Sequence, residues 1–123
     1  MKTTKDVVLE YFNAFDKNKG WENLVSNDIK MSSPTGTIKG KEAFIEMTNQ
    51  FKQLVKTAKV KSIIVEGENA SALTSYELVL PTNDKMNLEV AETISVKEQK
   101  IDSFEIYFDT VKFNEFIAKM NNN

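Results

Sequence analysis

The stretch from Met86 to Asp109 constrains the fold of this chain more than any other segment. Apolar residues occupy alternate positions on both sides of the polar turn Lys97–Lys100, a pattern that predicts two antiparallel strands with one buried face each. Matching the two apolar faces places Ile94 opposite Phe104. A slip of one residue would turn the aromatic side chains to the wrong face, so the pattern also fixes the register.

One residue of this hairpin departs from the alternation. Glu92 falls at an inward position, opposite Ile106 in the predicted register. An ionised carboxylate is costly to bury without a partner, so Glu92 is predicted to be protonated, hydrogen-bonded, or facing a cavity that holds water or ligand. Two interpretations stay open. Glu92 is either a functional acid in a pocket or a structural carboxyl bonded to Tyr11, to Tyr76 or to a buried water.

The residue types that the chain lacks exclude several kinds of chemistry. At 123 residues, the chain is predicted to form a single domain over residues 1–123. It has no Cys and no His, and all 16 basic residues are Lys. A Ser-His-Asp or Cys-His relay, a zinc site of the usual type and a bidentate guanidinium clamp are therefore excluded. The carboxylates lack the spacing of a calcium loop, so no metal and no cofactor is predicted.

The charge balance argues against nucleic acid as a partner. The 16 lysines are spread among 18 acidic residues, which gives a formal net charge of −2 and no field that would gather phosphates. The lysines at 52, 56, 59 and 61 are most simply a solvated face. Residues 1–6 lead into an amphipathic pattern without a signal-peptide run, and no segment approaches a membrane span. We therefore expect a cytoplasmic protein with no membrane partner.

Helical periodicity occurs in four segments. Thr3 or Thr4 can cap a first helix, whose apolar stripe directs the Tyr11 hydroxyl inward. A short helix is predicted at 21–25, and a last helix follows Asp109. The helix that starts at Lys41 has a broad core face at Phe44, Met47, Thr48, Phe51, Leu54 and Val55.

Strand patterns occupy most of the remaining chain. After a polar turn at 26–28, Met31 and Ser33 share the inward face of a short strand, which makes Ser33 an inward polar group. Residues 34–40 are predicted to be a turn and a second brief strand, and their glycines lack the spacing of a phosphate loop.

Two further strands are predicted at 58–66 and 70–80, the second with apolar residues in both phases. Leu73 and Val79 face outward there, which predicts that a partner subunit covers them and that the protein is a homodimer. The order of elements predicts an α+β fold in which a curved mixed sheet wraps around helices and leaves a conical cavity.

In this order and spacing, the elements resemble the nuclear transport factor 2-like superfamily, and within it the SnoaL-like branch that also takes in ketosteroid isomerases. The resemblance covers the whole chain and implies the cone-shaped fold, also called cystatin-like, with an internal pocket. It rests on the aromatic-rich segment 8–15, Trp21, the turn 33–36, the Gly-Lys-Glu-Ala-Phe segment 40–44 and the hairpin end 105–109.

The resemblance to ketosteroid isomerases implies roles for two residues. Those enzymes carry a tyrosine on the inner face of the first helix as an oxyanion donor, and the matching residue here is Tyr11. They carry a protonated acid on the penultimate strand as the second donor, and the matching residue here is Glu92, one methylene longer than an aspartate. The expected catalytic pair is therefore Tyr11 and Glu92.

The general base of these relatives has no counterpart in the chain. Ketosteroid isomerases use an aspartate immediately before a proline, and Ser33 precedes Pro34 at the matching place. Serine is not a base at neutral pH, which argues against isomerisation of that kind. Limonene-epoxide hydrolases of the same fold need an arginine that the chain lacks, and no inward Asp or His matches the one that SnoaL-type polyketide cyclases use. The sequence does not decide whether the protein is an enzyme.

Two functions follow as hypotheses. The first is a pocket that binds a small, largely apolar molecule through its carbonyl or hydroxyl group, with Tyr11 and Glu92 as donors. The expected ligand contacts are Phe15, Trp21, Met31, Ser33, Phe44, Met47, Phe51, Tyr76, Phe104, Ile106 and Phe108. The second is a dimeric binding or scaffold module that acts through the outer sheet face at Leu73, Val79 and Tyr107.

Overall fold

A computed structural model describes residues 2–121 of the chain. The described part has the predicted order of elements, with three α-helices and six strands. The elements are α1 (Thr4–Lys17), η1 (Trp21–Leu24), β1 (Val25–Ser33), β2 (Gly36–Lys39), α2 (Lys41–Lys52), β3 (Val55–Glu66), β4 (Asn69–Val79), β5 (Lys85–Lys97), β6 (Lys100–Phe108), α3 (Thr110–Ala118) and η2 (Lys119–Asn121).

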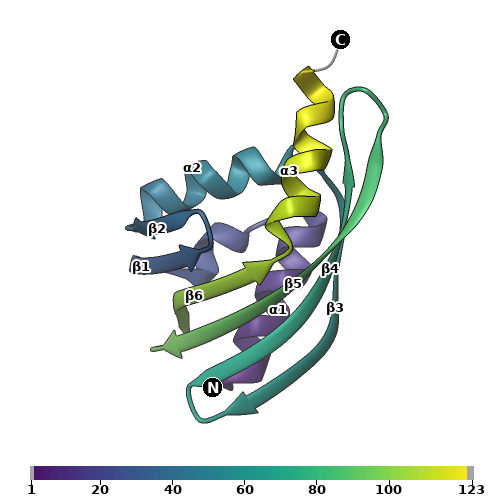
Figure 1. The fold of residues 1–123 in the computed structure, drawn as a ribbon. Coiled ribbons are helices and arrows are strands. Elements are labelled where there is room, and N and C mark those ends of the chain that lie inside the picture. The colour runs from purple at the N-terminus through teal and green to yellow at the C-terminus, as the bar shows by residue number, and fades with distance from the viewer. Residues whose placement is uncertain (1, 122–123) are drawn as a thin grey trace.

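The six strands form one mixed sheet in the order β2-β1-β6-β5-β4-β3. Only the β1–β6 pair is parallel among the described strands, and the other neighbours are antiparallel. Register shifts interrupt the β1–β6, β3–β4 and β5–β6 pairs, and such bulges increase the twist and bend of a sheet. The sheet is therefore curved and open, and α1 lies against its concave face while α2 and α3 lie at the upper end in Figure 1.

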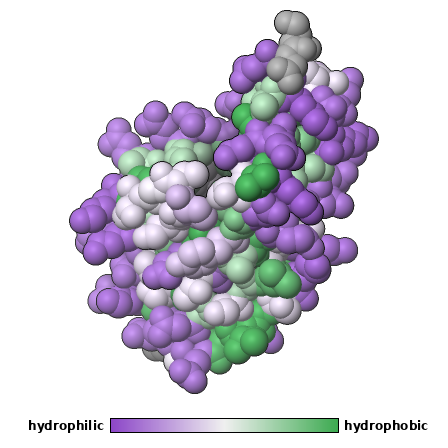
Figure 2. All heavy atoms as spheres, in the orientation of Figure 1, coloured by the Kyte–Doolittle hydropathy of each residue, from purple (hydrophilic) through white to green (hydrophobic). Residues whose placement is uncertain are grey.

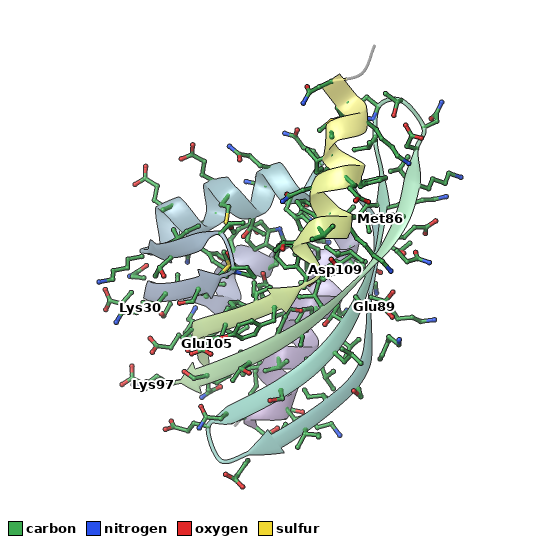
Figure 3. All side chains as sticks on the ribbon, in the orientation of Figure 1. Lys30, Met86, Glu89, Lys97, Glu105 and Asp109 are labelled. Atoms are coloured by element: carbon green, nitrogen blue, oxygen red, sulfur yellow. The ribbon has the colours of Figure 1, made fainter. Side chains whose placement is uncertain are left out.

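The register of the β5–β6 hairpin is the predicted one. Ile94 pairs with Phe104 and Glu92 pairs with Ile106. Glu98 and Gln99 have φ of 51° and 63°, as a two-residue hairpin turn requires. Glu89 and Glu105, in the opposite phase to Glu92, project away from the concave face (Figure 3). The alternation of side chains therefore turns Glu92 inward, as predicted.

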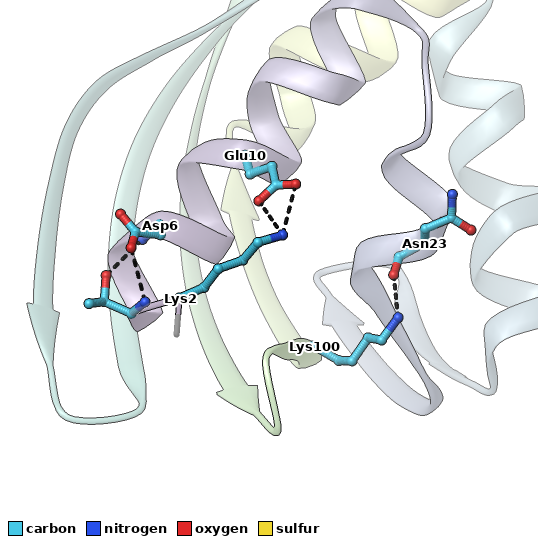
Figure 4. A network of polar contacts seen from close by, with 6 residues as sticks. Lys2, Asp6, Glu10, Asn23 and Lys100 are labelled. Carbon is cyan, nitrogen blue, oxygen red and sulfur yellow. Dashed lines mark hydrogen bonds and ion pairs between the residues drawn. The ribbon is translucent and has the colours of Figure 1, made fainter.

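Helix α1 begins and ends with local signals that the sequence carries. Thr3 accepts a hydrogen bond from the Asp6 amide, and the Asp6 side chain accepts one from the Thr3 amide, forming a capping box (Figure 4). Asn18 ends the helix in the left-handed conformation, with φ of 56°. These caps set the ends of α1, and its apolar stripe places Val8, Tyr11, Phe12 and Phe15 in the core.

Two predicted boundaries are wrong. Helix α2 ends at Lys52, and Val55 starts β3 instead of continuing the helical stripe. Residues 26–28 belong to β1 and not to a turn. At Val55, pairing with Leu78 of β4 overrides the helical pattern. Residues 26–28 lie at the irregularity between the Val25–Ile101 and Lys30–Ser103 pairs of β1 and β6.

None of the helices in the described part of the chain is long and apolar enough to span a membrane. The cytoplasmic location expected from the sequence stays a prediction.

Candidate functional site

A cavity of about 410 Å³ lies between the concave face of the sheet and the three α-helices. Exposed Thr35 and Gln50 and half-buried Phe113 and Ile117 mark its mouth, and Figure 2 shows the surface hollowed beside α3. The lining residues are Tyr11, Phe15, Met31, Ser33, Thr35, Phe44, Met47, Thr48, Gln50, Phe51, Leu54, Tyr76, Leu88, Val90, Glu92, Phe104, Ile106, Phe108, Phe113 and Ile117.

Glu92 is the charged residue of this lining. Its side chain is 5% exposed, and the Tyr76 hydroxyl donates a hydrogen bond of 3.1 Å to its Oε2 atom. No lysine lines the cavity within the described residues, so the carboxyl has no cationic partner there. The structure therefore realises one of the predicted interpretations, a carboxyl bonded to Tyr76, and also places that carboxyl on a cavity.

Burial raises the pKa of Glu92 to about 7, because the apolar surroundings disfavour its charged form. The hydroxyls of Thr74 and Tyr76 act in the opposite direction and lower that pKa by favouring the carboxylate. Thr74 is fully buried beside Glu92 on β4, and its Oγ1 lacks a partner at good hydrogen-bond geometry. Both protonation states of Glu92 are consequently accessible near neutral pH.

Tyr11 and Tyr76 hold their protons at neutral pH. Burial, followed by the nearby Glu92 charge, raises the pKa of both phenols well above the ordinary value. Tyr11 is 4% exposed and packs edge-on against Phe12 at 5.4 Å between ring centroids. Both hydroxyls are therefore hydrogen-bond donors rather than phenolates in the unliganded cavity.

Aromatic rings form most of the remaining wall. The rings of Phe44 and Phe104 stack at 5.6 Å, and Tyr76 contacts Phe15 at 5.9 Å and Phe51 at 5.2 Å. Such an apolar wall with a few polar points is typical of small-molecule sites.

The structure brings all but one of the predicted site residues to the cavity. Tyr11 and Glu92 lie on it, as do all the expected contacts except Trp21. Trp21 is 1% exposed and packs against Tyr11, Phe15 and Phe44, so the structure places it behind the wall and not on the cavity. Trp21 starts η1, which is not one of the helices that face the cavity, and this position accounts for its place behind the wall.

Sequence reasoning missed several lining residues. Phe113 and Ile117 of α3 lie at the mouth, and nothing in the sequence fixes how far α3 folds back over it. Leu88 and Val90 share the inward phase of β5 with Glu92, which was the signal that could have found them. The others are Thr35, Thr48, Gln50 and Leu54.

Among the described residues that line the cavity, Glu92 is the one candidate base. Ser33, at the position of the ketosteroid isomerase base, lies within 2.9 Å of the Thr35 hydroxyl and within 3.4 Å of the Gly36 carbonyl oxygen. Within residues 2–121, no group of three His, Cys, Asp or Glu side chains is placed to hold a metal ion. Glu92 is therefore the group of this cavity whose proton can be exchanged near pH 7.

The family that this architecture indicates also matches the sequence directly. Residues 8–104 match the SnoaL-like domain family. The chain belongs to that family. The matched segment starts within α1 and ends on β6, so this SnoaL-like domain includes both Tyr11 and Glu92. A comparison of the sequence with curated proteins finds no match.

Solved structures share the fold of this SnoaL-like domain at low sequence identity. An NTF2-like protein of unknown function from Burkholderia pseudomallei is 18% identical, with a TM-score of 0.84 over 96% of this chain and 99% of its own. TerC, co-crystallised with polyporic acid, is 17% identical, with a TM-score of 0.81 over 94% of this chain and 98% of the TerC chain. A proposed SnoaL-like polyketide cyclase from Jannaschia sp. CCS1 is 13% identical, with a TM-score of 0.81 over 94% of this chain and 91% of the cyclase chain.

Proposed function

We propose that this SnoaL-like domain binds a small, largely apolar molecule that carries a carbonyl or hydroxyl group. One observation carries the proposal: Glu92, the one buried acid among the described residues, lies in a largely apolar cavity of about 410 Å³. In its neutral form the carboxyl donates one hydrogen bond to the ligand oxygen, and the Tyr11 hydroxyl donates another. The aromatic walls hold the carbon skeleton.

If the protein turns its ligand over as an isomerase would, the Glu92 carboxylate takes a proton from the carbon beside the ligand carbonyl, and the Tyr11 hydroxyl donates to the enolate oxygen that forms. Neutral Glu92 then returns that proton to another carbon of the ligand, and its pKa of about 7 suits it to both steps near neutral pH. The related polyketide cyclase fold and the polyporic acid bound by TerC favour aromatic or polycyclic ligands over linear ones.

Binding is tested with neutral steroids and aromatic ketones and alcohols, by the rise in melting temperature that they produce. A ligand at 100 times its dissociation constant stabilises the folded state by about 2.7 kcal/mol. Tyr11→Phe removes one donor without changing ring volume, so we expect the affinity for such a ligand to fall by about tenfold.

The matched control is Tyr107→Phe, the same change at an exposed tyrosine on the outer sheet face. It is expected to leave the affinity unchanged. If no compound stabilises the wild type, or if both variants bind as the wild type does, the pocket proposal fails.

A second candidate function is supported by the outer face of the sheet. Tyr107, Ala91, Leu73 and Ser62 form one continuous row across β6, β5, β4 and β3. Leu73 is 40% exposed and Tyr107 is 58% exposed, although both carry large apolar side chains. We propose that a second copy of the chain covers this row and that the protein is a homodimer.

The dimer is tested by Leu73→Lys, which introduces a charge into the centre of the row. We expect sedimentation or light scattering to show a dimer for the wild type and a monomer for the variant, because the new ammonium would be buried without a partner. Leu9→Lys is the matched control, since Leu9 on α1 is equally exposed, at 38%, but lies on another face. A monomeric wild type, or a dimer that survives Leu73→Lys, contradicts this assignment.

A further inference from the structure

The cavity contains one acidic side chain, Glu92, and no basic side chain among the described residues that line it. The titratable side chains that line it are Tyr11 from α1, Tyr76 from β4 and Glu92 from β5. Helices α2 and α3 and strands β1 and β6 contribute no titratable group to the lining within the described residues. When Glu92 loses its proton, the cavity therefore holds one full negative charge and nothing to compensate it.

The walls around this charge are suited to a cation. The rings of Tyr11, Phe15, Phe51, Tyr76 and Phe104 all line the cavity, and the faces of such rings attract cations. The ring of Phe15 already binds a cation of this chain, the ammonium group of Lys52. The Lys52 Nζ atom lies 4.0 Å from the Phe15 ring centroid and donates a 2.6 Å hydrogen bond to the Phe15 carbonyl oxygen, although Lys52 itself does not line the cavity.

We propose that the cavity also binds a small arylalkylammonium ion, with its charged nitrogen paired to the Glu92 carboxylate and its aromatic ring among the phenylalanines. This inference uses the cavity of the proposed function, but it requires the opposite protonation state of Glu92. A carbonyl ligand needs the neutral carboxyl as a donor and an alcohol can bond to either form, whereas an ammonium ion needs the carboxylate as an acceptor.

The hydrogen-bonding capacity of Glu92 fits this partner. Tyr76 donates to Oε2, and the carboxylate has further lone pairs that can accept from an incoming N–H group. The Tyr11 and Tyr76 oxygens keep lone pairs that accept further N–H bonds. An ammonium ion thus supplies the charged partner whose absence makes ionised Glu92 unfavourable in this apolar site.

The dependence of binding on pH distinguishes the two ligand classes. The probes are 3-phenylpropylamine and 3-phenylpropan-1-ol, which share a skeleton and differ in the terminal group. The alkylamine, like a lysine side chain with a pKa of about 10.4, stays protonated at pH 6 and at pH 8. Between these values, a carboxyl with a pKa of about 7 changes from about one-tenth to about nine-tenths ionised. Titration calorimetry is therefore expected to show about tenfold tighter amine binding at pH 8 than at pH 6. Alcohol binding is expected to change much less, because a hydroxyl accepts from the neutral carboxyl and donates to the carboxylate.

Two variants on the same strand complete the test. Glu92→Gln keeps the shape and a donor but cannot ionise, so it is expected to lose amine binding at pH 8 and to bind the alcohol without pH dependence. Glu89→Gln makes the same change three positions away, on the exposed outer face, where Glu89 pairs with Lys61. It is expected to bind both probes as the wild type does.

The inference and the proposed function fail separately. Alcohol binding without amine binding, or amine binding that persists unchanged in Glu92→Gln, overturns the inference and leaves the proposed function in place. Amine binding without alcohol binding supports the inference and contradicts the proposed function. If neither probe binds at either pH, the inference is overturned.

Discussion

Glu92→Gln is expected to make the protein more stable than the wild type by about 3 kcal/mol at pH 8. Glutamine has the shape of a protonated glutamate, so it occupies the site without a charge to bury. The wild type at pH 8 must either hold a carboxylate in an apolar cavity or keep Glu92 protonated at a pH above the pKa of that group. The figure follows from the pKa of Glu92, which rises from 4.5 to about 7 on burial.

The sign of this effect determines the pH at which it is seen. Folded Glu92 binds its proton more tightly than unfolded Glu92, so its contribution to stability is fully present below about pH 4.5. That contribution is lost as the pH rises through about 7. At pH 4.5 the variant and the wild type are therefore expected to be similar in stability, and the gap opens towards pH 8.

Urea unfolding of both proteins across this range measures the gap directly, because all other titrating groups are common to the two chains. Glu89→Gln on the outer face is the control and should show no such gap. Parallel stability curves for the wild type and Glu92→Gln would mean that Glu92 is not buried as the structure has it.

The hairpin that carries Glu92 could be predicted because its information is local. Side chains in a strand alternate with a period of two, so the register and the inward direction of Glu92 follow from the apolar residues of two adjacent segments. The same holds for Tyr11, whose place on the inner face of α1 follows from the helical stripe and the capping residues. The positions of Tyr11 and Glu92, the two proposed donors, were thus accessible from the sequence.

The boundary of the cavity could not be predicted because it depends on how distant elements pack. Phe113 and Trp21 are both large aromatic residues near apolar neighbours, and no local pattern indicates which of the two reaches the cavity. In the structure, Phe113 of α3 reaches the cavity, whereas Trp21 of η1 is buried behind its wall. Likewise, the pairing of Val55 with β4 ends α2 earlier than its own periodicity indicates.

Trp21→Ala is expected to have the largest effect on stability, a loss of about 3–5 kcal/mol. The indole is 1% exposed and contacts three rings of the wall, Tyr11, Phe15 and Phe44, at 6.2–6.3 Å between ring centroids. Its removal leaves a void that close-packed neighbours fill only in part. Thermal unfolding of a domain of this size should shift down by roughly 10–20 °C.

Phe113→Ala separates this structural role from a role in binding. Phe113 is half-buried at the mouth of the cavity, so its truncation is expected to cost only about 1–2 kcal/mol of stability while weakening ligands that reach α3. Trp21→Phe is the complementary variant, since it keeps a ring behind the wall and should retain ligand affinity. Substitution of Trp21 is therefore expected to cost more stability than substitution of Phe113, whereas substitution of Phe113 is expected to cost more ligand affinity. A Trp21→Phe variant that is as stable as the wild type but no longer binds ligand would place Trp21 in the site after all, because a residue behind the wall cannot affect binding without disturbing the packing that supports it.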